Sequence, residues 1–184
     1  MEDWHAVALV FGQTVVVATF LAALASKLRD PEGFTAAIRG FKLVAPQRIQ
    51  PLAWLLTGVE VVIVALILAG YLPGATLAAR LGLGLAGVLL LGYTAALVTV
   101  RVRRMRVACH CFGASPALVS WYDVARNVLL LGCAGLGLAG AVLDERLTAT
   151  DTALVALAGL CAALLITNLA NVVSTAVRVP GTTE

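Results

Sequence analysis

Five apolar stretches, separated by short polar segments, follow one another along the chain. They cover about residues 6–26, 52–71, 81–100, 124–143 and 152–173. A helix of roughly 20 residues crosses the ~30 Å hydrocarbon layer of a bilayer, so each stretch is long enough to span it. The pattern predicts an all-α, polytopic membrane bundle of about five transmembrane helices.

The first stretch also has a feature of a removable targeting segment. Ala23-Leu24-Ala25 resembles a small-residue cleavage site. Glu2 and Asp3, however, put negative charge where a signal peptide carries positive charge. We therefore expect this stretch to be retained as the first span.

Composition strengthens the membrane assignment. Hydrophobic residues make up 61% of the chain, charged residues 12%, and the mean hydropathy is +0.98. These values lie outside the range of soluble globular domains. With 184 residues, the chain has room for one bundle and no appended soluble domain. Recognition and chemistry are therefore expected in the spans or in short loops.

Positive charge is concentrated in two of the predicted loops. Residues 27–50 contain five basic side chains and residues 101–123 contain four, whereas residues 72–80 and 144–151 contain one each. Cytoplasmic loops of membrane proteins carry the excess of Lys and Arg. The charge pattern therefore predicts an outside N-terminus and a cytoplasmic 101–123 loop.

The first basic loop contains an amphipathic segment at about residues 31–48. Apolar Phe34, Ile38 and Phe41 alternate there with Arg39 and other basic residues. We expect a short interfacial helix that lies on the membrane surface near anionic head groups and is closed by Pro46.

Small residues in two spans indicate close helix packing. Gly82 and Ala86 in the third span, and Gly135 and Ala139 in the fourth, have the small-xxx-small spacing. This spacing lets two helix backbones approach each other closely.

A carboxylate lies inside the second span. Glu60 is costly in hydrocarbon unless it is paired, and Lys27 and Arg126 lie at compatible depths. A structural ion pair and a role in proton handling both remain open. Three amides in the spans are expected to form hydrogen bonds between helices; they are Gln13, Asn168 and Asn171.

The segment Cys109-His110-Cys111-Phe112-Gly113 follows the run RVRRMR in the second basic loop. Two cysteines this close cannot both join a closed tetrahedral zinc site with the histidine between them, so we expect no metal. A disulfide across one intervening residue is strained and exchanges easily. Nearby cations lower the pKa of a thiol; those available are Arg103, Arg104, Arg106 and a protonated His110. Phe112 and Gly113 would turn the chain back toward the bilayer.

In chain order, these features resemble the methylamine-utilisation MauE family, a branch of the DoxX-like membrane proteins. The matching residues are SKLRDPEGF with Lys27, FKLVAP with Pro46, Glu60, CHCFG, and Arg126-Asn127. The resemblance implies a four-helix DoxX-like core and a redox-associated protein that helps to form disulfides in exported proteins beside a thioredoxin-like partner. It implies that Cys109 and Cys111 are the redox pair, supported by Lys27, Glu60, Arg126 and Asn127. His110 departs from the family pattern, which more often has a small residue there.

The implied function conflicts with the predicted sidedness, because disulfides of exported proteins form on the outer face. Electrons that cross the membrane would reconcile the two. Cys133 and Cys161 lie at similar depths in the last two spans, which makes them a candidate relay pair; cysteine is also a small apolar packing residue.

Three classes of function follow from the sequence. The first is a thiol:disulfide oxidoreductase that lies in the lipid bilayer and exchanges electrons with a thioredoxin-like partner. A quinone is a candidate for its final electron acceptor. The second is a small-molecule or ion carrier that uses Glu60, Gln13 and Asn168, although no predicted span contains an internal proline. The third is a non-catalytic subunit that docks a redox enzyme. We expect no nucleic-acid partner in any of them.

Overall fold

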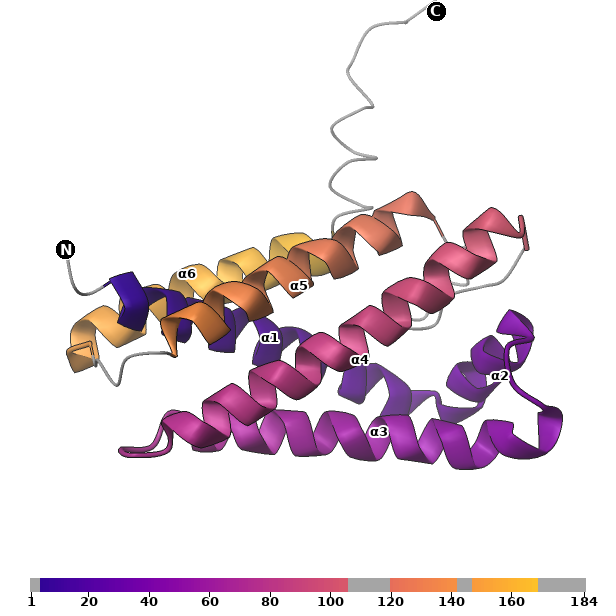
Figure 1. Ribbon diagram of the computed structural model, residues 1–184, viewed down its shortest axis with the longest axis horizontal. Coiled ribbons are helices and arrows are strands. Elements are labelled where there is room, and N and C mark those ends of the chain that lie inside the picture. The colour runs from indigo at the N-terminus through magenta and orange to yellow at the C-terminus, as the bar shows by residue number, and fades with distance from the viewer. Residues whose placement is uncertain (1–3, 106–119, 142–146, 169–184) are drawn as a thin grey trace, which may run out of the picture.

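The computed structural model describes residues 4–105, 120–141 and 147–168. All of its regular elements are helices (Figure 1). In chain order they are α1 (Trp4–Arg29), α2 (Pro31–Phe41), α3 (Pro46–Ala69), α4 (Thr76–Val102), α5 (Trp121–Gly140) and α6 (Ala149–Thr167).

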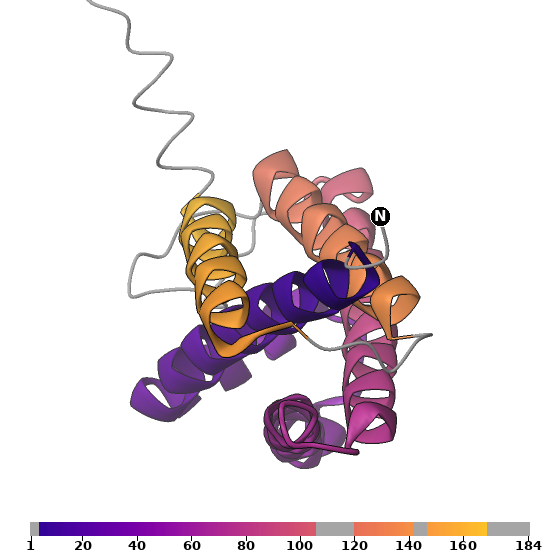
Figure 2. The ribbon, with the colours of Figure 1, turned by 90° about the vertical axis from the view of Figure 1, so that its left-hand side faces the viewer.

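Helix α1 is the centre of the bundle. It packs most extensively against α5 and α6 and also contacts α3, while α4 lies between α3 and α5. Figure 2 shows α5 and α6 on one side of α1 and α3 on the other. Half of the most apolar stretch of α1 is buried, compared with 11% in α6. Helix α6 is therefore a peripheral element that covers one side of α1.

Five described helices are long and apolar enough to cross a membrane, namely α1, α3, α4, α5 and α6. Their outward faces carry leucine and valine side chains such as Leu77, Val88 and Leu164, each more than 60% exposed. Lipid tails satisfy such surfaces, and the helices satisfy their own backbone hydrogen bonds. The all-α fold and the five predicted spans are confirmed. Val173, the predicted end of the last span, lies outside the described residues.

Two boundaries differ from the sequence prediction around the first basic loop. Helix α2 ends at Phe41, where Lys42 adopts a left-handed conformation with a φ of 51°. Pro46 does not close α2 but is the first residue of α3, where its missing N–H costs nothing. Pro51 lies inside α3 but just before the predicted span of residues 52–71, which itself contains no proline.

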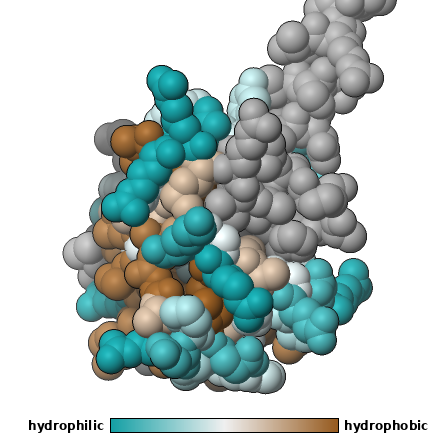
Figure 3. Space-filling model, turned by 90° about the vertical axis from the view of Figure 1, so that its right-hand side faces the viewer, coloured by the Kyte–Doolittle hydropathy of each residue, from teal (hydrophilic) through white to brown (hydrophobic). Residues whose placement is uncertain are grey.

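The apolar side chains Phe34 and Ile38 of α2 are buried in the protein. Phe34 and Ile38 pack with Ile49 and Ala53 of α3 in a small core of their own. The polar side of α2 faces outward, and hydrophilic side chains surround a smaller apolar area at this end of the molecule (Figure 3). We call it the α2 end; α3 begins there.

Glycines set the crossing of α1 and α5. A Cβ added at Gly12 would lie 2.6 Å from the carbonyl oxygen of Cys133 and 2.7 Å from the Cα of Gly137. The predicted pair Gly135 and Ala139 is wrong as the packing face of α5, because both residues are exposed. The predicted pair on α4 does pack: Gly82 lies against Ile67 of α3, and Ala86 is fully buried.

Candidate functional site

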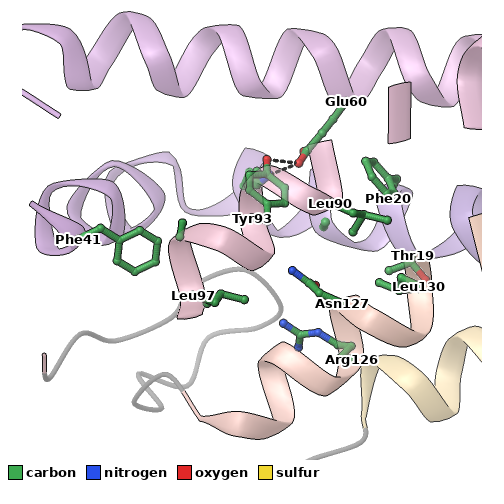
Figure 4. A pocket seen from close by; sticks show the side chains of 13 residues that line it. Thr19, Phe20, Phe41, Glu60, Leu90, Tyr93, Leu97, Arg126, Asn127 and Leu130 are labelled. Carbon is green, nitrogen blue, oxygen red and sulfur yellow. Dashed lines mark hydrogen bonds and ion pairs between the residues drawn. The ribbon is translucent and has the colours of Figure 1, made fainter. Parts of the chain in front are cut away.

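A pocket of about 50 Å³ lies near the α2 end, between α1, α3, α4 and α5. Its apolar walls include Phe20, Leu90 and Leu130. Its polar side chains come from four helices, and Figure 4 shows Glu60 and Tyr93 pointing toward each other with Arg126 and Asn127 across the pocket. The polar residues are Thr19 and Lys27 of α1, Glu60 of α3, Tyr93 of α4, and Arg126 and Asn127 of α5.

Lys27 and Glu60 form a buried ion pair at one wall of this pocket. The Lys27 Nζ donates to Glu60 Oε1 and, at 3.2 Å, to the hydroxyl of Tyr93. The Tyr93 hydroxyl in turn donates to Glu60 Oε1 at 2.7 Å. One carboxylate oxygen thus accepts two hydrogen bonds, which compensates part of the cost of burying the charges. The other, Glu60 Oε2, is buried and has no hydrogen-bond partner among the described residues.

Helix α2 keeps this pair away from the polar surface. Asp30 caps the helix by accepting a hydrogen bond from the N–H of Gly33 at 2.8 Å, and the chain folds back directly after α1. The ring of Phe34 then lies 4.6 Å from the Lys27 Nζ, within the range of a cation–π interaction. Phe41, the last residue of α2, lines the pocket. The amphipathic segment therefore serves as a cover over Lys27.

Arg126 lies on the opposite wall and pairs with a different acid. Its Nη2 is 3.3 Å from Asp123 Oδ1, one turn earlier in α5. Asp123 also accepts hydrogen bonds from the backbone N–H of Ser120 at 2.8 Å and from its hydroxyl at 3.0 Å. The same carboxylate thus caps the start of α5 and orients Arg126. Of the two plausible partners of Glu60, Lys27 forms the ion pair with it, and Arg126 forms an ion pair with Asp123 on the other side of the same pocket.

The chain on both sides of the predicted redox loop is firmly held at this end. Helix α4 ends in a Schellman motif: Arg104 is left-handed with a φ of 52°, and the Met105 N–H donates to the Val100 carbonyl at 3.1 Å. Arg101 lies over the ring of Trp121 at 5.6 Å, which connects the end of α4 to the start of α5.

A small apolar cluster adds to this connection. It contains Leu97, Val100 and Met105 from α4 and its end, Phe41 from α2, and Val124 from α5. Five predicted site residues, Cys109, His110, Cys111, Phe112 and Gly113, lie outside the described residues, as does Arg106. Arg103 and Arg104 are described and exposed.

The family model of methylamine utilisation protein MauE matches residues 5–140, well over half of the 184-residue chain. The chain belongs to the MauE family. The match ends where α5 ends, so it includes every residue that lines the pocket, and α6 lies beyond it. The chain matches no curated protein and no solved structure. The MauE resemblance drawn from the sequence motifs is confirmed, and the protein is a multi-pass membrane protein.

The two cysteines in the spans of this MauE protein differ in their surroundings. Cys133 of α5 is half-buried beside the core, whereas Cys161 of α6 is exposed; both are free thiols. Helices α5 and α6 contact each other little, because both pack mainly on α1. The relay between these thiols stays a prediction.

The amides in the spans behave differently from the sequence prediction. Gln13 is 1% exposed and lines a separate pocket at the opposite end of the bundle, and its amide nitrogen has no hydrogen-bond partner among the described residues. Asn168 donates to the Leu164 carbonyl of its own helix at 3.0 Å. The interhelical bond predicted for Asn168 is therefore wrong. Asn171 lies outside the described residues.

Two polar residues of the MauE site were missed by the sequence analysis: Tyr93, which lines the pocket, and Asp123, which pairs with the pocket residue Arg126. Tyr93 is a polar side chain in an apolar span, so the argument that singled out Glu60 applied to it as well. Asp123 follows Ser120 by three residues just before an apolar run, which is the spacing of a helix capping box. Both patterns are visible in the sequence, but neither indicates which buried residue the side chain contacts.

Proposed function

We propose that this MauE-family protein is a membrane thiol:disulfide redox protein that works through Cys109 and Cys111. Its substrate class is a thioredoxin-like partner, whose dithiol it oxidises in support of disulfide formation in exported proteins. The reacting group is the cysteine pair that the MauE resemblance implies.

The observation that carries the proposal is the convergence of Lys27, Glu60 and Arg126 on one pocket. These residues come from three helices, and the family resemblance had named them as support for the cysteines. Met105 and Ser120, which border the cysteine loop in the chain, lie at the ends of α4 and α5 near the same pocket. Buried charged residues that line a pocket mark a candidate functional site, and in the chain the two cysteines belong to the segment that joins α4 to α5.

Each exchange balances in atoms and electrons. A thiolate of the partner attacks one sulfur of the Cys109–Cys111 disulfide, and the other cysteine leaves as a thiolate. The second partner thiolate then attacks the mixed disulfide, so the partner becomes a disulfide and this protein a dithiol. Two electrons and two protons move from the partner to the loop. Arg103 and Arg104, exposed at the end of α4, add positive charge that favours the thiolate form.

Trapping tests the proposal. A Cys109→Ser or Cys111→Ser variant keeps one loop thiol, which can attack the disulfide form of a thioredoxin-like partner. The second loop thiol that would release the partner as a dithiol is missing, so one of the two variants should accumulate a covalent adduct. Non-reducing gel electrophoresis and mass spectrometry identify the adduct. A Cys133→Ser variant, which keeps the loop pair, is the matched control. Wild-type rates of partner oxidation in both loop variants would refute the proposal.

Labelling of the same cysteines settles their sidedness. The charge pattern predicts that a membrane-impermeant maleimide labels Cys109 and Cys111 only from the cytoplasmic side. Labelling from the outer side instead would agree directly with oxidation of exported proteins and would reverse the predicted orientation.

The pockets favour the redox proposal over a carrier. A polar path was expected to use Glu60, Gln13 and Asn168. Glu60 and Gln13 line different pockets near opposite ends of the bundle, and Asn168 is exposed.

A further inference from the structure

The pocket that Gln13 lines is at the end of the bundle opposite to the α2 end. The starts of α1 and α6 and the turn from α3 to α4 lie at this end, on the left in Figure 1. The volume of the pocket is about 300 Å³, at the lower end of the range of small-molecule sites. Part of its wall is formed by Leu147, Ala149 and Thr152, which lie beyond the residues that the MauE model matches. We call it the Gln13 pocket.

A buried amide lines the Gln13 pocket. Gln13 is 1% exposed, and its Nε2 has no hydrogen-bond partner among the described residues. Gly70, at the end of α3, lines the same pocket, and a Cβ added there would lie 2.7 Å from this Nε2. The glycine thus leaves the space that the amide occupies. A buried amide donor without an acceptor costs free energy, so an acceptor bound in the pocket would stabilise it.

The hydroxyl of Tyr71 is the second polar group of the pocket wall. Its oxygen is 2.7 Å from Thr14 Oγ1. The Thr14 hydroxyl donates its own hydrogen to the Val10 carbonyl at 2.7 Å, so Tyr71 is the donor to Thr14. The Tyr71 oxygen therefore keeps its lone pairs and can accept a hydrogen bond. The pocket thus offers a donor at Gln13 and an acceptor at Tyr71.

The rest of the pocket wall is uncharged. No Asp, Glu, Lys, Arg or His is among the described residues that line it. Thr76 and Thr152 add hydroxyls, and Leu9 and Val10 of α1 make part of the wall apolar. An ion would lose its hydration in this pocket without meeting an opposite charge. The pocket therefore fits an uncharged molecule with an apolar body and one polar group.

We propose that the Gln13 pocket binds an uncharged amphipathic molecule whose polar group both accepts and donates a hydrogen bond, of which a primary carboxamide is the best match. The carbonyl oxygen of the carboxamide accepts from Gln13 Nε2, and its N–H donates to the Tyr71 oxygen. The apolar body lies against Leu9 and Val10. This inference does not depend on the proposed thiol function, because the pocket is at the opposite end of the bundle from the buried ion pairs.

Probes of one shape and different charge test the class of ligand. They are para-fluorobenzamide, which is neutral, para-fluorobenzoate, an anion, and para-fluorobenzamidinium, a cation. Each is added to the full chain in lipid nanodiscs, and fluorine NMR line broadening measures binding against empty nanodiscs. The expected result is saturable binding of the benzamide alone, with competition by unlabelled benzamide. Equal affinity for an ionic probe, or no saturable binding of the benzamide, would overturn the inference.

Gln13→Leu tests the donor. Leucine is similar in size to glutamine, so the fold should be retained. The affinity for para-fluorobenzamide should fall about fivefold or more, because the carbonyl oxygen loses its hydrogen bond. Gln50→Leu, at an exposed glutamine of α3 that does not line the pocket, is the matched control and should bind like the wild type. Equal affinities of the two variants would contradict the proposal.

Tyr71→Phe tests the acceptor without a change in the buried core, since Tyr71 is 36% exposed. It should also weaken binding of para-fluorobenzamide. The N,N-dimethyl form of this probe has no N–H to donate, so it should bind equally weakly to the wild type and to Tyr71→Phe. Thermal unfolding shows that each variant is folded. An unchanged affinity of Tyr71→Phe for the benzamide would overturn the assignment of a carboxamide.

Discussion

Lys27 of α1 and Glu60 of α3 form an ion pair whose side chains are only 3% and 1% exposed. Removing one partner of such a pair leaves an uncompensated charge in the bundle. We expect Lys27→Met to lower the free energy of unfolding by about 3–5 kcal/mol. Thermal unfolding in detergent, followed by circular dichroism, measures the effect.

The double variant Lys27→Met with Glu60→Leu removes both charges and should recover most of this loss. Lys42→Met, at an exposed lysine, should change stability little. A double variant as unstable as the sum of its single changes would show that the two residues do not act as a pair.

Tyr93→Phe removes the hydroxyl that donates to Glu60 Oε1 at 2.7 Å. Because the acceptor is a carboxylate, we expect a loss of about 1.5–3 kcal/mol in the free energy of unfolding. Tyr122→Phe, at a side chain that is 46% exposed, is the control and should be close to wild type. Equal effects of the two substitutions would contradict a specific role for the Tyr93 hydroxyl.

Gly12→Ala tests the crossing of α1 and α5. The added Cβ would lie 2.6 Å from the Cys133 carbonyl oxygen, and both partners are backbone, so the helices must move apart. We expect a loss of about 1–3 kcal/mol in the free energy of unfolding. Gly132→Ala on α5, where a Cβ meets no atom within 4 Å, should be neutral or stabilising. Both are measured by thermal unfolding.

Asp123→Ala should affect both the start of α5 and the redox chemistry. The cap contributes about 1 kcal/mol to stability, and without Asp123 the guanidinium of Arg126 loses its described acid. Asp151→Ala removes the similar contact with Thr148 at the start of α6, far from the pocket. We expect Asp123→Ala to lose more stability than Asp151→Ala, because it also removes the ion-pair partner of the buried Arg126. Only Asp123→Ala should slow mixed-disulfide formation, as measured by quenched-flow trapping at a temperature where both variants are folded.

The exposure of the cysteines in the spans predicts their labelling. In a background with Cys109→Ser and Cys111→Ser, a lipid-soluble maleimide should modify exposed Cys161 several-fold faster than half-buried Cys133. Mass spectrometry of the two peptides gives the rates. A faster reaction at Cys133 would show that α5 and α6 are arranged differently around α1.

Much of the fold follows from local pattern. The five spans are readable because each contains about 20 apolar residues, a length that only a membrane helix requires. Lys27 as the partner of Glu60 was also predictable, since both are charges that need compensation at similar depths in the bundle. The α2 segment was predicted as amphipathic, but its packing on α3 through Phe34 and Ile38 was not predicted, because amphipathicity does not identify the apolar partner.

Other parts of the site depend on helix rotation, which the sequence leaves open. Gly135 and Gly137 lie in the same apolar run of α5, yet of the two only Gly137 faces α1. Arg126 and Glu60 have compatible depths in the bundle, but Arg126 forms an ion pair with Asp123, which lies three residues earlier on the same face of α5. Tertiary packing decides between such nearly equivalent choices.

The contact of Arg101 with Trp121, and the hydrogen bond from Ser120 to Asp123, have an evolutionary consequence. Because these contacts hold the ends of α4 and α5 through residues outside the segment 106–119, substitutions or insertions in that segment leave the contacting side chains unchanged. Under the proposed function, selection can therefore change the sequence between α4 and α5 while the buried charges of the pocket stay constant. Chimeras that exchange only this segment between relatives would then change specificity and preserve the scaffold.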